Sequence, residues 1–177
     1  MLRGNYNTSR FRSEPLQKKE RELEIRKARL SEAEEIRRVV NNYAKDGLVL
    51  PRSLADVYEN IRDFYVLVDE EGKLRGCAAL HIVWQGWAEV RSILVDNELR
   101  GRGYGKELVA LCLKEAKELG IKKVFALTYL SDFFRKLGFQ TEDKAALPHK
   151  VWSDCINCPQ FPDCNEVAVV YTISPME

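Results

Sequence analysis

The sequence predicts an α/β (α+β) domain with one mixed, mostly antiparallel sheet flanked by helices. Short apolar or alternating runs, typical of strands, recur along the chain, and segments with helical spacing stand between them. The turn sequences EEGK and WQGW separate consecutive strand-like runs, which favours antiparallel neighbours. With 177 residues, 45% of them hydrophobic, the chain has the size and apolar content of one globular domain.

The N-terminal segment differs from the rest of the chain. Residues 1–22 hold few apolar residues and show no regular period, so we expect a flexible arm. A single domain is expected over residues 23–177. Its elements are predicted in this order: strand 23–28, helix 31–47, helix 53–63, strands 64–69, 74–83 and 87–96, helix 103–119, strand 122–127, helix 131–138, and strands 139–143 and 166–173.

The first predicted elements rest on spacing and on capping residues. Residues 23–28 alternate between apolar and polar, as a half-buried strand does. The first helix is expected to begin with Ser31 and Glu34 as a capping box. The second helix is expected to begin after Ser53, a preferred N-cap residue.

The later elements are bounded by glycines and by one further cap. The long amphipathic helix ends at Gly120, and the apolar run after it predicts a buried strand. The short helix over 131–138 is expected to begin with Ser131 as its cap and to stop at Gly138.

Charge and hydropathy exclude several classes of function. The net charge of +1 creates no field that would attract nucleic acid or an anionic membrane. No apolar run approaches the roughly 20 residues of a membrane span, and the polar N-terminus lacks the apolar core of a signal peptide. We therefore expect a cytoplasmic protein that binds neither nucleic acid nor membrane.

Two of the five cysteines and one histidine lie inside apolar patterns. Cys77 and Cys112 are interpreted as small core residues of a strand and a helix. His81, in the run AALHIV, is interpreted as a histidine that packs within its strand.

The other three cysteines cluster late in the chain, in a segment predicted as a loop. Cys155, Cys158 and Cys164, with His149, have a spacing that suits a zinc site of three sulfurs and one nitrogen. In a reducing compartment they are also compatible with redox-active thiols, or with structural thiols in a loop that covers the substrate. The spacing alone commits the chain to no metal.

A glycine-rich loop carries the strongest chemical signal. Residues 100–106, RGRGYGK, stand between a strand and a long helix. Glycines let backbone N–H groups approach a ligand closely, and a helix start favours anions. The sequence is neither a Walker A loop nor a dinucleotide fingerprint. The pattern therefore suggests a different pyrophosphate site.

The pattern R-x-x-G-x-G, formed by Arg100, Gly103 and Gly105, resembles the acetyl-CoA loop of the GNAT family of N-acetyltransferases. The later stretch FFRKLGF is similar to the closing corner of that family. The resemblance implies the GNAT fold, with acetyl-CoA as co-substrate. It assigns the pantetheine arm and the pyrophosphate to these residues: Ile93, Leu94, Val95, Arg100, Gly101, Arg102, Gly103, Tyr104, Gly105 and Lys106.

Three further stretches, DGLVLPRS, AEVRSILVD and the C-terminal LPHKVWSDC, resemble the short bacterial N-acetylglutamate synthases. This resemblance implies L-glutamate as the acceptor and a role in arginine biosynthesis. Because glutamate carries two carboxylates, its site needs cations. The candidate substrate-binding residues are Arg52, Arg91, Ser92 and Lys150.

The side chain of Arg91 is expected on the strand face that also carries Ile93 and Val95, because the three alternate. Glu89 stands two positions earlier, where the family often keeps a general base. Many family members have a tyrosine that acts as general acid, and the matching position here is Phe134. Thr128 and Tyr129 are therefore the candidates to protonate the leaving thiolate.

Other functions remain open. The acceptor could be a different small amine or a protein N-terminus, and a non-catalytic acetyl-CoA-binding module is the alternative outside enzymes. The amino-acid-kinase domain of longer synthases has no counterpart here, so feedback inhibition by arginine is not implied. The family resemblance implies a homodimer as one assembly.

Overall fold

The computed structural model describes residues 22–156, 158 and 163–174. Within them seven strands form one sheet in the order β1-β2-β3-β4-β5-β7-β6. The strands are β1 Glu24–Lys27, β2 Phe64–Val68, β3 Leu74–Trp84, β4 Trp87–Val95, β5 Lys123–Thr128, β6 Gln140–Glu142 and β7 Val167–Thr172. All pairs are antiparallel except β4 with β5, so the predicted fold class is confirmed. The predicted arm, apart from Glu22, lies outside the described residues.

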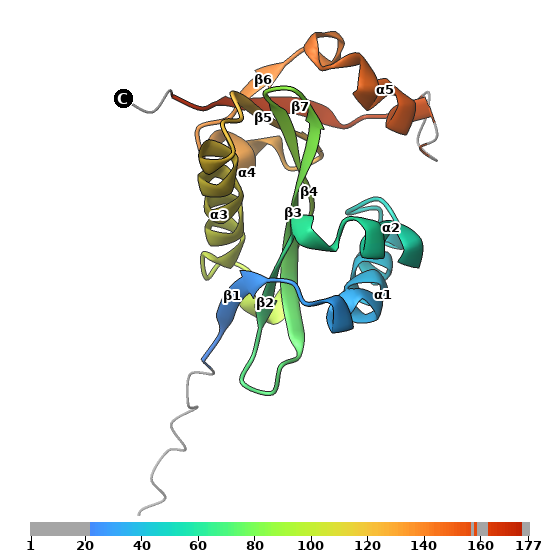
Figure 1. The fold of residues 1–177 in the computed structure, drawn as a ribbon, viewed down its shortest axis with the longest axis vertical. Coiled ribbons are helices and arrows are strands. Elements are labelled where there is room, and N and C mark those ends of the chain that lie inside the picture. The colour runs from blue at the N-terminus through green and yellow to red at the C-terminus, as the bar shows by residue number, and fades with distance from the viewer. Residues whose placement is uncertain (1–21, 157, 159–162, 175–177) are drawn as a thin grey trace, which may run out of the picture.

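Helices cover both faces of this sheet. They are α1 Ala33–Ala44, α2 Leu54–Glu59, α3 Tyr104–Glu118, α4 Ser131–Arg135 and α5 His149–Ile156, with short 3-10 turns η1 Leu30–Glu32, η2 Ile61–Asp63, η3 Asn97–Leu99 and η4 Lys144–Ala146. In Figure 1, α3 lies on one side of β3 and β4, and α1 and α2 lie on the other. Among the described residues, no helix combines the length and the apolar composition needed to cross a bilayer.

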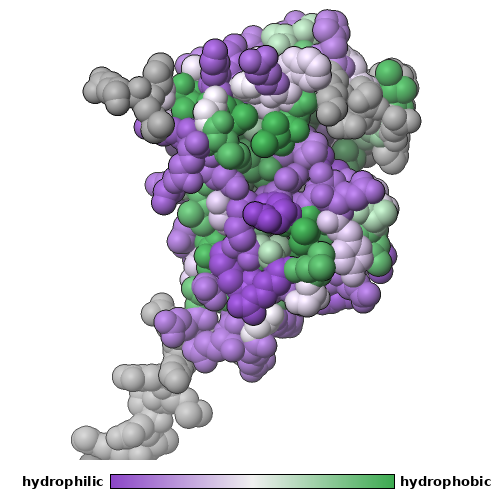
Figure 2. Space-filling view, viewed as in Figure 1, coloured by the Kyte–Doolittle hydropathy of each residue, from purple (hydrophilic) through white to green (hydrophobic). Residues whose placement is uncertain are grey.

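Each face of the sheet has its own core. On one face, Leu108 of α3 and Phe134 of α4 are fully buried against the strands. On the other face, Ile36 of α1 and Val57 of α2 are buried in a second cluster. Figure 2 shows that polar residues cover most of the visible surface and that apolar patches interrupt it chiefly in the upper half. The interpretation of Cys77 and Cys112 as core residues is confirmed, since both are fully buried.

Two of the predicted helix caps are wrong and one is confirmed. Ser53 accepts a hydrogen bond from the backbone N–H of Asp56 at 3.0 Å, as predicted. Ser31 does not cap α1, because a 3-10 turn precedes that helix and the carboxylate of Glu32 accepts the N–H of Arg29 instead, at 2.7 Å. Ser131 is the first residue of α4 rather than its cap.

The helix α5 was not predicted, because the spacing of the cysteines suggested a loop or a metal site. The apolar residues at 151, 152, 155 and 156 nevertheless have helical spacing. Leu147, just before α5, is buried beside Phe125 of β5, and Cys155 of α5 packs against the same cluster. The helix thus closes the end of the sheet formed by β5 and β7.

The parallel pair β4–β5 is short. Residues 87–89 of β4 pair with residues 123–125 of β5, and the pairing ends there although both strands continue. The backbone of β4 beyond Glu89 therefore faces an opening between the two halves of the sheet.

Candidate functional site

A cavity of ≈ 720 Å³ fills this opening between β4 and β5. Its walls also include the segment before α2, parts of β3 and α5, and the residue Phe134 of α4. Seven of the predicted substrate, catalytic and cofactor residues line it: Arg52, Glu89, Arg91, Ser92, Ile93, Thr128 and Tyr129. The fold thus brings the predicted substrate and catalytic candidates together around one cleft.

A β-bulge interrupts β4 at the cavity wall. Between the paired residues Arg91 and Leu94, β4 carries one residue more than β3 does between Ala79 and Cys77. Ser92, inside the bulge, has a φ of 52°, a left-handed conformation that is uncommon for serine.

The bulge reverses the alternation of side chains along β4, so the predicted common face of Arg91, Ile93 and Val95 is wrong. Ile93 and Val95 pack against the core under α3. Arg91 lies opposite Ala79, which belongs to the core under α1 and α2, and directly paired residues share a face. The strand therefore presents Arg91 to one side of the sheet and Ile93 to the other.

Arg52 and Arg91 converge on the cavity. The backbone N–H of Arg52 donates to the Asn41 side chain at 2.8 Å, and the Asn41 amide donates back to the Arg52 carbonyl at 2.9 Å. The Arg52 guanidinium lies 3.4 Å from Asp56. This double hydrogen bond from α1 fixes the segment before α2, so that the side chain of Arg52 is only 17% exposed.

The two arginines share a pocket that leaves part of their hydrogen-bonding capacity unused. The Nε atoms of Arg52 and Arg91 are buried, and neither has a hydrogen-bond partner among the described residues. Burial lowers the pKa of the Arg91 guanidinium, and the nearby charge of Arg52 lowers it further, against the opposing effect of Glu89. Two half-buried guanidinium groups whose Nε donors have no partner among the described residues form an environment that an anion would stabilise.

Glu89 occupies the point where β4 and β5 separate. It is the last β4 residue paired with β5, opposite Phe125, and it lies opposite His81 of β3 on its other side. Its charge counteracts the lowering of the Arg91 pKa, which places the carboxylate and the guanidinium in the same electrostatic environment. A carboxylate at this point borders both the cation pair and the opening between the strands.

His81 is not simply packed within its strand, contrary to the sequence interpretation. Its Nδ1 lies 2.7 Å from the Asp63 carboxylate, at the end of η2, and the ring lines the cavity. No local sequence signal connects Asp63 with His81, which are 18 positions apart.

The candidate acids occupy different environments. Thr128 is buried, and its hydroxyl accepts the N–H of Leu130 at 2.9 Å. Tyr129 is 46% exposed, and desolvation followed by the charges of Glu166, Cys164 and Cys158 raises the pKa of its phenol. Phe134 is buried in the cavity wall, as expected for an apolar ring at this position.

The glycine loop has the backbone expected for an anion site. Gly101 and Gly103 adopt positive φ values of 78° and 93°, and Gly103 is the N-cap of α3. The first-turn N–H groups of α3 have no intrahelical acceptors. A Cβ at Gly101 or Gly103 would have no neighbour within 4 Å, so the loop surface is open on that side.

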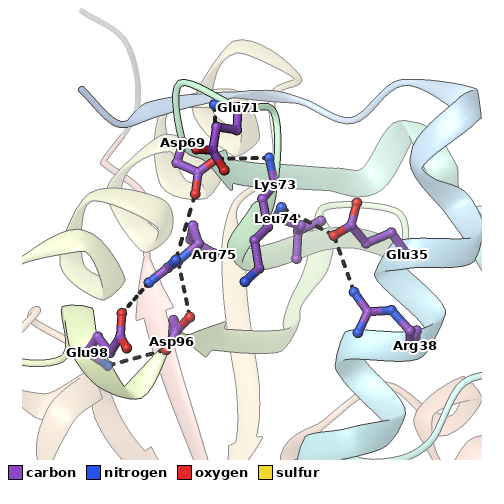
Figure 3. A network of polar contacts seen from close by, with 9 residues as sticks. All are labelled: Glu35, Arg38, Asp69, Glu71, Lys73, Leu74, Arg75, Asp96 and Glu98. Carbon is purple, nitrogen blue, oxygen red and sulfur yellow. Dashed lines mark hydrogen bonds and ion pairs between the residues drawn. The ribbon is translucent and has the colours of Figure 1, made fainter. Parts of the chain in front are cut away.

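An ion network around the buried Arg75 fixes the start of this loop (Figure 3). The Arg75 guanidinium lies 2.8 Å from Glu98, 3.1 Å from Asp96 and 3.7 Å from Asp69. Asp96 caps η3 and Glu98 belongs to it, so one arginine of β3 anchors the turn that leads into Arg100. The glycine spacing predicted this loop, but nothing in the sequence analysis predicted that Arg75 of β3 would anchor it.

The cysteine cluster borders the same cavity. The side chains of Cys155, Cys158 and Cys164 line it, and Lys144 donates to the Cys164 carbonyl at 3.2 Å. Among the residues that the structure describes, no group of three histidine, cysteine or acidic side chains is placed to hold a metal ion. His149 is exposed in the first turn of α5.

Lys150 follows in the same helix, and its side chain lies outside the described part of the structure. The predicted role of Lys150 at the substrate therefore stays a prediction.

Comparisons with known proteins agree with this architecture. A model of the acetyltransferase (GNAT) family matches residues 30–139. An uncharacterized N-acetyltransferase of Chlorobaculum tepidum is 40% identical over 149 residues, which cover 84% of this chain and 96% of that protein. An amino-acid acetyltransferase of Mycobacterium tuberculosis is 36% identical over 117 residues, 65% of this chain and 67% of that protein.

A solved structure is also similar. N-acetylglutamate synthase from Neisseria gonorrhoeae, complexed with coenzyme A and N-acetyl-glutamate, matches with a TM-score of 0.77 at 27% identity, covering 86% of this chain and 35% of that longer chain. The residues matched by the family model include both the separating strands β4 and β5 and the glycine loop before α3. The chain therefore belongs to the acetyltransferase (GNAT) family, with acetyl-CoA as its co-substrate.

Proposed function

We propose that this enzyme transfers the acetyl group of acetyl-CoA to the α-amino group of L-glutamate, the first step of arginine biosynthesis. The observation that carries the proposal is the cation pair of Arg52 and Arg91, whose buried Nε atoms have no hydrogen-bond partner among the described residues. Relatives named amino-acid acetyltransferase, and the likeness to an N-acetylglutamate synthase, support the same substrate class.

The physical argument is one of charge. A dicarboxylate brings two anions, and a guanidinium binds a carboxylate through parallel N–H donors. Arg91 is half-buried beside Arg52, so its charge is maintained at a cost that a bound carboxylate would relieve. A neutral amine or a polyamine would offer no such compensation.

The proposed chemistry uses residues around the opening in the sheet. Glu89 takes a proton from the acceptor ammonium, directly or through water, so that the amine can attack the thioester carbonyl. Backbone N–H groups near Leu94 stabilise the tetrahedral oxyanion, and Ile93, Leu94 and Val95 pair with the pantetheine arm. Tyr129, or less directly Thr128, supplies a proton to the thiolate.

The pyrophosphate of acetyl-CoA is proposed to bind the loop before α3. The loop backbone and the start of the helix supply N–H donors, with charge from the basic residues around them. The residues in this role are Arg100, Gly101, Arg102, Gly103, Tyr104, Gly105 and Lys106.

The substitution Gly103→Ala is expected to weaken acetyl-CoA binding by roughly tenfold or more, since one lost charge-assisted hydrogen bond is worth about 1.5 kcal/mol. At a φ of 93° the alanine also strains the backbone, by about 1–2 kcal/mol. Calorimetric titration with acetyl-CoA measures the first effect and thermal unfolding measures the second.

Gly120→Ala is the matched control, because Gly120 follows the other end of α3 with a φ of 73° and open space around its Cβ. It should lose similar stability and keep its affinity for acetyl-CoA. Equal affinities in the two variants would show that the loop does not bind the pyrophosphate.

The acceptor is tested by thiol release from acetyl-CoA with a panel of amines at equal concentration. Glutamate is expected to react fastest, glutamine more slowly because it lacks the side-chain charge, and a simple aliphatic amine slowest. If a polyamine or a peptide N-terminus exceeds glutamate, the glutamate assignment is wrong while the acetyltransferase assignment stands.

A further inference from the structure

Outside the residues already assigned a role, the cavity wall holds one histidine that is oriented by a carboxylate. His81 Nδ1 and Asp63 Oδ2 are 2.7 Å apart, with side-chain exposures of 24% and 22%. An ionised carboxylate only accepts hydrogen bonds, so Nδ1 must carry the proton of this contact. In the neutral ring this leaves Nε2 as an unprotonated acceptor.

The sheet places this ring beside the proposed base. His81 of β3 and Glu89 of β4 are direct partners in the antiparallel register. Directly opposite residues project from the same face, with Cβ atoms about 4.5–5.5 Å apart. Both side chains line the cavity, so Glu89 and the ring face the same space.

We propose that His81, oriented by Asp63, is the proton-relay residue that carries the proton from Glu89 to solvent during acetyl transfer. The inference rests on the proposed function, in which Glu89 is the base, and it adds the route by which that base is regenerated. Partial exposure of the ring gives the proton an exit that a fully buried residue would lack.

The steps balance. An N–H bond of the acceptor ammonium breaks as an O–H bond forms on Glu89. That bond then breaks as an N–H bond forms at Nε2 of His81, and the imidazolium, stabilised by Asp63, releases the proton to water. The amine lone pair forms the C–N bond, the C–S bond breaks, and the thiolate takes a proton from the hydroxyl of Tyr129, which the second proton of the amine replaces. One proton is released per turnover.

The groups around the ring are mixed in charge. Asp63 of η2 contacts the ring and Glu89 of β4 is its cross-strand partner, while Arg91 lies in the electrostatic environment of Glu89, Asp56 and Asp63. The thiol of Cys155 lies across the cavity on α5, and its pKa is raised by desolvation and by the neighbouring thiols and Glu89.

The experiment compares His81→Gln, His81→Ala and Asp63→Asn with the wild type, using whichever amine of the panel the wild type acetylates fastest. This choice separates the relay from the identity of the acceptor. For His81→Gln, kcat is expected to fall by about 10- to 100-fold, with little change in the KM of the amine. The kcat of Asp63→Asn is expected to fall as well. Added imidazole should restore kcat of His81→Ala in a concentration-dependent manner, because a mobile base replaces the missing ring.

Glu24→Gln is the control, since it removes an ion-paired carboxylate from β1 outside the cavity and should leave kcat unchanged. Thermal unfolding checks that each variant is folded, and Asp63→Asn keeps the test decisive if the His81 variants unfold. The relay is refuted if the folded variants stay within about twofold of wild-type kcat. It is equally refuted if the loss appears as a raised KM, or if imidazole has no effect.

Discussion

Glu89→Gln is expected to lower kcat at pH 7 by roughly 100-fold or more, the usual cost of losing a general base. The glutamine keeps the size of the side chain but cannot take a proton from the acceptor ammonium. The loss should diminish at high pH, because free amine then becomes abundant without help from the enzyme. Steady-state rates across pH with saturating acetyl-CoA measure both effects.

Glu89→Asp is the companion variant, since it keeps the carboxylate and shortens its reach. It should retain more activity at pH 7 than Glu89→Gln does. Because the Glu89 charge also compensates Arg91, the KM of the acceptor must be measured alongside kcat. A wild-type rate for Glu89→Gln at pH 7 would remove Glu89 from the mechanism.

Replacing Arg52 or Arg91 with glutamine is expected to raise the KM for glutamate by about 10- to 150-fold, equivalent to about 1.5–3 kcal/mol for a lost charge-assisted contact. Acetyl-CoA binding should change little, because the proposed cofactor contacts are made by backbone groups elsewhere. Arg38→Gln is a suitable control, since that arginine forms an exposed ion pair with Glu35 outside the cavity.

The same arginine variants should not lose much stability in the absence of ligand. Arg91 is half-buried beside a repelling neighbour, and its Nε has no hydrogen-bond partner among the described residues, so its removal relieves a cost as well as a contact. Thermal unfolding with and without glutamate separates the two contributions. If the variants unfold far more easily than the wild type and keep their KM, the arginines serve the fold rather than the substrate.

The elements with regular periodicity could be predicted from the sequence. The alternation and turn signals identified the strands of the sheet, and the glycine spacing located the loop before α3. Ser53 could be predicted as a cap because its partner lies three residues away. Such features depend on neighbours in sequence, which a single chain displays directly.

The features that depend on contacts between distant segments could not be predicted. The partnership of Asp63 with His81 arises only when η2 packs beside β3. Nothing in the local sequence around either residue indicates it.

The bulge in β4 was missed for a different reason. A strict period of two is the default assumption for a strand, and Ser92 is an ordinary residue that gives no warning of a positive φ. The error moved Arg91 to the wrong face while leaving the strand itself correctly predicted.

Because of the extra residue in the bulge, the alternation of side chains shifts by one position within β4. Odd-numbered residues before Ser92, such as Arg91, face the side of α1 and α2, and odd-numbered residues after it, such as Ile93, face the side of α3. Point substitutions along β4 change one contact at a time. Deleting Ser92 would instead remove the bulge and its bend from the cavity wall, while Arg91 and Ile93 would keep their opposite sides. Variation within this strand should therefore accumulate as substitutions, with its length preserved.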